Sequence, residues 1–214
     1  GEGCPEWDYK ANLRVAEHPA EETNAHGGAL HLDHSSTRIV SCWFEDNHTL
    51  SSSDSRTTSL GGALYAYASN VEVDDCHFQG NAARSFTWGN NQQIVDQAYA
   101  GGGAIAAYDT DLKVTNSTFQ SNRVVMAAEA GNRLEFDAFA FGGAIYCGST
   151  VRDYTKPRMA NCDFLDNEVL LADVNTDHLL VEPGWGGALA FEMVQGKGMA
   201  VVEYCLFEGN HATL

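Results

Sequence analysis

Four of the six cysteines occupy one position, two residues before a recurring phenylalanine: Cys42, Cys76, Cys162 and Cys205. If the segments that carry them stack side by side about 4.8 Å apart, their Cα atoms fall within the range that a disulfide accepts. Disulfides Cys42–Cys76 and Cys162–Cys205 would suit an oxidising, extracellular location. The alternative is a column of buried thiols that pack as small apolar residues. A metal site is not indicated, because no Cys-x-x-Cys or Cys/His spacing occurs.

The histidines and acids form no catalytic pattern. His26, His31 and His34 lie close in sequence, and the solvated outer face of a strand accounts for them better than a metal site. The residues directly before each recurring phenylalanine are Trp43, His77, Thr118, Asp163 and Leu206, so no column of carboxylates is available for acid–base cleavage of a glycan. We therefore expect no catalytic residue, no metal centre and no cofactor, with weak Ca²⁺ binding as the alternative.

Aromatic residues form the best candidate binding surface: Tyr65, Tyr67, Tyr108, Tyr146, Trp88 and Trp185. An exposed tyrosine face can bind sugar rings or a protein partner, and the alternative is a set of stabilising cross-strand ladders. The connecting segments 82–101, 123–141 and 168–185 are also rich in apolar residues. We expect them to pack along one flank of the fold, and the alternative is a contact surface for a partner chain.

Asn116 starts an Asn-Ser-Thr sequon and is expected to face outward, so it is a candidate glycosylation site. Asn47 also starts a sequon, but its place in the repeat described next points it toward the interior.

A five-fold repeat positions all of these residues. Each copy begins with Gly-Gly-Ala followed by Leu or Ile, and each continues to Phe-x-x-Asn. The glycine pairs are Gly27–Gly28, Gly61–Gly62, Gly102–Gly103, Gly142–Gly143 and Gly186–Gly187. The phenylalanines are Phe44, Phe78, Phe119, Phe164 and Phe207, and the asparagines are Asn47, Asn81, Asn122, Asn167 and Asn210. Variable spacing around constant anchors indicates one geometry with insertions at set points.

The period within each repeat predicts strands rather than helices. Apolar and polar residues alternate after each glycine pair and again before each phenylalanine. Two short strands per repeat, stacked in register on the next repeat, give a parallel β-solenoid of about five coils over residues 27–214, with long loops on one flank. Residues 1–26 form an N-terminal segment or a preceding partial coil. Segment Val124–Glu129 is expected to form one helical turn.

Three ladders follow from this stacking. The phenylalanines form one interior column. The asparagines form a second column at a bend, where asparagine tolerates a left-handed backbone and its amide can bond its neighbour. The glycines occupy a corner that requires a positive φ or presses against the neighbouring coil.

Composition limits the partners. The formal net charge of −17 over 214 residues disfavours nucleic acid and anionic lipid. No apolar run approaches the roughly 18 residues of a membrane span, and the first residues do not show the charged-then-apolar pattern of a signal peptide. We expect the chain to be a segment of a longer protein.

The Gly-Gly-Ala-Leu/Ile and Phe-x-x-Asn repeat resembles that of the chlamydial polymorphic outer-membrane proteins. This resemblance implies a right-handed parallel β-helix at the cell surface that serves as an adhesin or structural spacer, with no catalytic residues. A protein or glycan at the surface, or neighbouring subunits, would be the partners. Two alternatives stay open: a scaffold subunit of an extracellular filament or large complex, joined through coil ends and connector loops, and a polysaccharide-active β-helix lyase or glycosidase.

Overall fold

The computed structural model describes residues 22–53, 56–89, 96–130, 136–149, 156–172, 180–181, 184–193 and 200–213. These residues form strands and turns and contain no helix. The strands make five sheets of five strands each, and every sheet takes one strand from each of five repeats. In the order in which the chain visits them within a repeat, we name them the first to the fifth sheet.

The strands are as follows. The first sheet contains β1 (Glu22–His26), β6 (Arg56–Leu60), β11 (Asp96–Gly101), β16 (Phe136–Phe141) and β21 (Leu180–Val181). The second contains β2 (Leu30–Asp33), β7 (Leu64–Tyr67), β12 (Ile105–Tyr108), β17 (Ile145–Ser149) and β22 (Leu189–Met193). The third contains β3 (Ser36–Val40), β8 (Asn70–Asp74), β13 (Asp111–Thr115), β18 (Arg158–Ala160) and β23 (Val201–Glu203). The fourth contains β4 (Trp43–Glu45), β9 (His77–Gln79), β14 (Thr118–Gln120), β19 (Asp163–Leu165) and β24 (Leu206–Glu208). The fifth contains β5 (His48–Ser53), β10 (Ala82–Gly89), β15 (Arg123–Ala130), β20 (Glu168–Ala172) and β25 (His211–Thr213).

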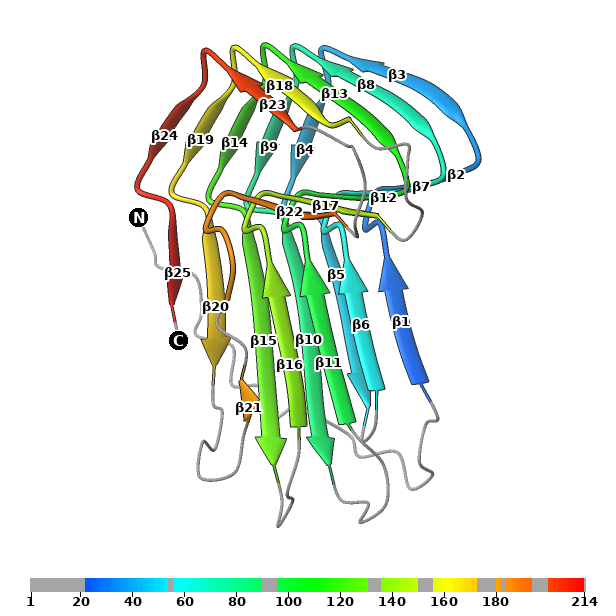
Figure 1. Cartoon of the computed structure of the whole chain (residues 1–214), viewed down its shortest axis with the longest axis vertical. Helices are drawn as coiled ribbons and strands as arrows, with labels where there is room; N and C mark the ends of the chain where they lie inside the picture. The colour runs from blue at the N-terminus through cyan, green and yellow to red at the C-terminus, as the bar shows by residue number, and fades with distance from the viewer. Residues whose placement is uncertain are drawn as a thin grey trace.

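All strand pairs are parallel and join equivalent strands of successive repeats (Figure 1). The register places like residues opposite each other: Phe119, for example, lies between Phe78 and Phe164. Parallel strands stacked repeat on repeat fit a β-solenoid, as the sequence predicts. Residues 22–26 belong to the stretch that the sequence assigns to an N-terminal segment or a preceding partial coil, and in the structure they join the stack as β1, paired with β6.

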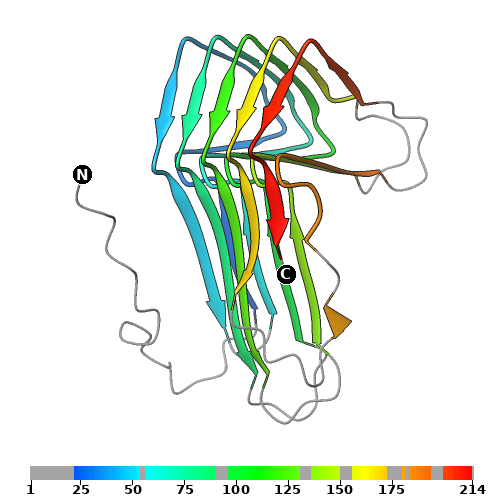
Figure 2. The same cartoon turned by 90° about the vertical axis from the view of Figure 1, so that its left-hand side faces the viewer.

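The repeats form two parts with separate cores (Figure 2). The second, third and fourth sheets surround the larger core, in which Leu64, Ile105, Val114 and Phe119 are fully buried. The longer strands of the first and fifth sheets run down from it and pack face to face. Their core consists of small and aliphatic side chains: Ala83, Ala98, Ala100, Val124, Met126, Ala140, Val169 and Leu171.

This lower part corrects the expectation of two strands per repeat with long loops on one flank. The described parts of the connecting segments are mainly strands of the first and fifth sheets. The single helical turn expected over Val124–Glu129 is wrong, because these residues belong to β15 and pair with β10 and β20. The parallel neighbours on both sides satisfy the backbone of β15, so the local apolar pattern does not decide its conformation.

The phenylalanine column lies in the larger core. Successive rings stack with centroids 4.7–5.0 Å apart and planes within 9° of parallel. Phe78, Phe119 and Phe164 are essentially inaccessible to solvent, whereas Phe207 in the last repeat is 47% exposed.

The asparagines form the predicted ladder, with one correction. Asn122 donates from its backbone N–H and its Nδ2 to Oδ1 of Asn167, at 3.1 and 3.0 Å, and also donates from Nδ2 to the carbonyl of Phe78. The positive φ lies one residue earlier than expected, at Asp46, Gly80, Ser121, Asp166 and Gly209. The asparagine side chain can therefore point inward while its neighbour makes the bend.

The two glycines of each pair have different roles. The first has a positive φ, as at Gly142 (59°). The second lies against the next repeat: a Cβ on Gly143 would be 2.0 Å from the carbonyl oxygen of Gly187. Both predicted reasons for glycine therefore apply: a positive φ at the first position and close contact with the next repeat at the second.

The cysteines at the shared position are free thiols in this structure, which corresponds to the alternative of packed thiols rather than to the disulfides Cys42–Cys76 and Cys162–Cys205. Each sulfur donates instead to the carbonyl two residues earlier, at 3.2 Å for Cys42 and 3.3 Å for Cys162. Ser117 makes the same contact through its hydroxyl and accepts a bond from the N–H of Cys76. The thiols thus make the same hydrogen bond as the Ser117 hydroxyl, at the turn between the third and fourth sheets. Burial raises the pKa of Cys162 to about 11 and that of Cys147 to about 12.

Replacing Phe119 by alanine should lower the free energy of unfolding by about 3–5 kcal/mol, because it empties the centre of the phenylalanine column. Urea denaturation followed by circular dichroism measures the change. Phe207→Ala is the matched control, since its half-exposed ring should cost much less. Equal losses for the two variants would contradict the interior column.

Candidate functional site

A cluster of aromatic and smaller apolar side chains fills the angle between the first and second sheets. We call this cluster the aromatic corner. Its members are Leu60, Tyr65, Ala106, Phe141, Tyr146 and Ala190, with Tyr99, Tyr108 and Phe139 packed against them. The alternation of the strands produces it. Ile145 and Cys147 of β17 enter the larger core, so Tyr146 between them faces the opposite side. Ala98 and Ala100 of β11 likewise enter the lower core, so Tyr99 faces the corner.

Three tyrosine hydroxyls and one carboxylate meet in this corner. The hydroxyl groups of Tyr99 and Tyr146 both donate to Oε2 of Glu192, at 2.8 Å from Tyr99 and at shorter range from Tyr146. The hydroxyl of Tyr108 lies 3.1 Å from that of Tyr99 and 3.0 Å from that of Tyr146. Oε1 of Glu192 receives no hydrogen bond from any residue that the structure describes.

These tyrosines are held in their neutral form. Burial is the largest cause that raises the pKa of Tyr99, Tyr108 and Tyr146. Glu192 adds to the rise of the pKa, whereas hydrogen bonds with Tyr99 and Tyr146 partly oppose it at Tyr108. Tyr65 has its pKa raised to about 12, first by burial and then by Tyr108. The hydroxyls therefore remain donors at neutral pH, and the negative charge of the cluster lies on the Glu192 carboxylate.

The other end of the aromatic corner contains two histidines. His26 stacks on Tyr65 with ring centroids 4.4 Å apart, and His31 meets the same ring edge-on at 5.0 Å. Nε2 of His26 is buried and has no hydrogen-bond partner among the residues that the structure describes. Burial, and then the proximity of His31, lower the pKa of His26.

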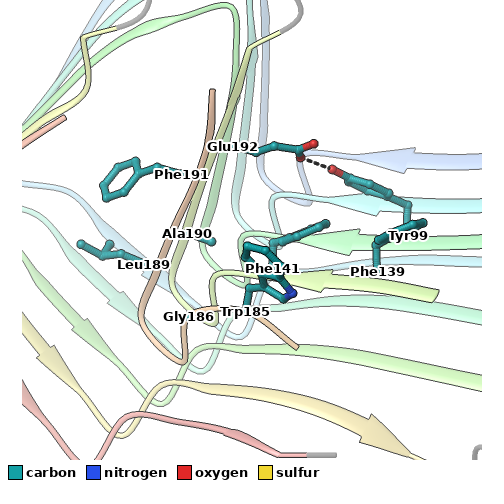
Figure 3. Close-up of a pocket in the computed structure, with 9 residues that line it drawn as sticks. All are labelled: Tyr99, Phe139, Phe141, Trp185, Gly186, Leu189, Ala190, Phe191 and Glu192. Carbon is teal, nitrogen blue, oxygen red and sulfur yellow. Dashed lines mark hydrogen bonds between the residues drawn. The ribbon is translucent and has the colours of Figure 1, made fainter. Parts of the chain in front are cut away.

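A hollow of about 410 Å³ opens at the end of the aromatic corner beside β22. Its lining residues are Tyr99, Phe139, Phe141, Trp185, Gly186, Leu189, Ala190, Phe191 and Glu192. Figure 3 shows that Glu192 and Tyr99 point toward each other, with Phe141 and Trp185 on the same side of the strand. Leu189 and Phe191 point to the opposite side, where they pack against the larger core.

The rings that line the hollow are not one flat stack. The planes of Phe141 and Trp185 differ by 63°, with centroids 6.3 Å apart, and those of Tyr99 and Phe141 differ by 44° at 5.3 Å, whereas Phe139 is nearly parallel to Phe141. Apart from Glu192, the described lining residues are uncharged.

The structure brings together only part of the aromatic surface that the sequence suggests. Tyr65, Tyr108 and Tyr146 share the aromatic corner, but Tyr65 and Tyr146 are buried rather than outward-facing, because the first sheet folds back over them. Tyr67 and Trp185 are exposed. The side chain of Trp88 lies outside the described residues.

Sequence reasoning placed Tyr99, Phe139 and Phe141 in connecting segments and missed Glu192. The signal for Glu192 is positional: it follows the first glycine of its pair by six residues, as Tyr67 and Tyr108 do in theirs, and the register aligns it in that column. Asn116, the candidate glycosylation site, is exposed in a turn and donates from Nδ2 to Asp74 at 2.8 Å.

Within the described residues, no group of three or more histidine, cysteine or acidic side chains is placed to hold a metal ion. Nor do these residues form a helix with the length and apolar character needed to span a membrane.

Acidification should weaken the fold through His26. Because its folded pKa lies below the unfolded value of about 6.5, the unfolded state binds the extra proton first, and stability falls as pH drops below about 7. Thermal unfolding between pH 7.5 and 5 should show a smaller loss in His26→Phe, which keeps the stack on Tyr65, than in the wild type. Parallel pH profiles for the two proteins would exclude this role.

Comparison of the chain with family models, with curated proteins and with solved structures finds no match. The stacked repeats and the aromatic corner therefore carry the functional conclusion.

Proposed function

We propose that the chain is a right-handed parallel β-helix of five coils that works as a non-enzymatic module of an extracellular surface, binding a partner through the aromatic corner. The observation that carries this proposal is the hollow, where exposed Trp185 adjoins Phe141, Tyr99 and Glu192. Concave aromatic sites with few polar groups are typical of ligand binding. The resemblance of the repeat to chlamydial polymorphic outer-membrane proteins supports display at a cell surface.

The arrangement of charged groups favours binding over catalysis. Hydrolysis of a glycan by paired acids needs two carboxyl groups facing one bond, and Glu192 is the sole acid among the described residues that line the hollow. Its nearest hydroxyls belong to tyrosines whose raised pKa keeps them protonated, so they supply no base at neutral pH. A polysaccharide lyase or glycosidase is therefore the weaker alternative.

Beads coated with the purified chain should adhere to at least one cell type in a panel of bacterial and eukaryotic cells. Trp185→Ala should reduce adhesion, because it removes an exposed wall of the hollow. Trp43→Ala is the matched control: Trp43 is also exposed, but it lies on the fourth sheet, where it stacks on His77. Adhesion to none of the cells, or release of sugar products from glycans added to the chain, would contradict the proposal.

A second candidate function, a scaffold subunit joined through coil ends, is favoured by the edge that β22, β23 and β24 form. Val202, Tyr204, Leu206 and Phe207 are exposed there, 39–87% by residue. Strands at such an edge also present backbone N–H and C=O groups that can pair with another chain.

If this edge joins copies of the chain, light scattering should show concentration-dependent association, and Leu206→Lys should suppress it by placing a charge on the edge. Gln120→Lys is the control, since Gln120 is exposed on β14, the central strand of the fourth sheet, and should leave association through the coil ends unchanged. A monomer at all concentrations would eliminate assembly through this edge.

A further inference from the structure

We propose that the hollow beside β22 binds an organic ammonium ion of the trimethylammonium type, with aromatic rings against its methyl groups and the Glu192 carboxylate as its counter-ion. This inference rests on the proposed binding function and specifies the chemistry of the ligand.

Charge is the first argument. Among the described residues, Glu192 is the sole charged side chain that lines the hollow, in a chain whose formal net charge is −17. No ion pair to Glu192 occurs among the described residues. An anionic ligand would be repelled here, and a cation would find a carboxylate that no described cation neutralises.

The carboxylate is already positioned for such a ligand. Tyr99 and Tyr146 both donate to Oε2, which fixes the group against the wall of the aromatic corner. Oε1 has no donor among the described residues, so it remains available as an acceptor. The carboxylate then acts on the ligand mainly through its charge.

The walls supply the second attraction. The faces of Trp, Tyr and Phe rings attract cations within about 6 Å of the ring centroid. The ring of Phe141 lies 5.3 Å from that of Tyr99 and 6.3 Å from that of Trp185, centroid to centroid, with planes inclined by 44° and 63°. An ion beside Phe141 therefore lies close to more than one ring. A trimethylammonium group also gives its methyl surface to these apolar walls, where a strongly hydrated ammonium would lose more water.

A neutral sugar fits less well. A sugar ring carries several hydroxyl groups that need partners when they leave water. The hydroxyl of Tyr99 is already engaged with Glu192, and the lining residues otherwise offer few polar side-chain atoms: the Trp185 indole N–H and Oε1 of Glu192. The hollow therefore matches a ligand with a charge and no hydrogen-bond donors at its head.

The test is calorimetric titration of the purified chain with choline chloride and, separately, with 3,3-dimethyl-1-butanol, which replaces the charged nitrogen by carbon. Choline should bind about tenfold more tightly or better, because the isostere keeps the shape and loses both electrostatic attractions. Nε-trimethyl-lysine is titrated in parallel. Tighter binding of choline would indicate a small headgroup as the natural ligand, and tighter binding of trimethyl-lysine a modified side chain.

Glu192→Gln keeps an oxygen that can accept from the tyrosines and removes the charge, so it should weaken choline binding several-fold while unfolding stays unchanged. Trp185→Ala should also weaken it, and Trp43→Ala should not. Equal affinity for choline and its carbon isostere, tighter binding of N-acetylglucosamine than of choline, or unchanged binding in Glu192→Gln would overturn the proposal. If cells adhere to coated beads and choline neither binds nor competes, the ligand assignment fails and the adhesive function stands.

Discussion

The structure depends on the close contact of equivalent backbone segments in successive repeats. At the glycine corner the chains are so near that a Cβ on Gly62 would lie 2.0 Å from the carbonyl oxygen of Gly103. This contact sets the register, and the register brings each phenylalanine over the next and each asparagine amide to the next asparagine. The aromatic corner is a consequence of the same register, because it adjoins the glycines and inherits the alternation of the strands on both sides.

The part of the fold that the sequence predicts is the part in which each repeat carries the same residue. Phe119, Asn122 and Gly143 are recognisable because their counterparts are identical, and each makes the same contact with its neighbours. The strands of the first and fifth sheets are also stacked in register, but the residue types at equivalent positions differ from repeat to repeat. Ser85 of β10 pairs with Ser51 on one side and Met126 on the other, so no repeated pattern marks these strands. Their conformation comes from the strand already in place beside them.

The candidate site was foreseen only in outline, for a related reason. The tyrosines after the glycine pairs were recognised as facing away from the larger core. Their burial could not be predicted, because it depends on the first sheet folding back over Tyr65 and Tyr146. The cysteines show a different limit: the 4.8 Å spacing permits a disulfide. The direction of the sulfur is set by its hydrogen bond to the carbonyl two residues earlier. The hydroxyl of Ser117 makes the same bond in this column.

The ladders also constrain how such a chain can reach its folded state. The hydrogen-bond partners of Asn81 and Asn122 lie 41 and 45 residues further along the chain. Closing loops of this length costs entropy before any contact rewards it, so the first pair of repeats should form slowly and further repeats should add readily to an existing edge. Folding of such a molecule therefore has a slow nucleation step, which is followed by faster propagation from repeat to repeat. A repeat with neighbours on both sides should keep its backbone protected from exchange for longer than a repeat with a neighbour on one side.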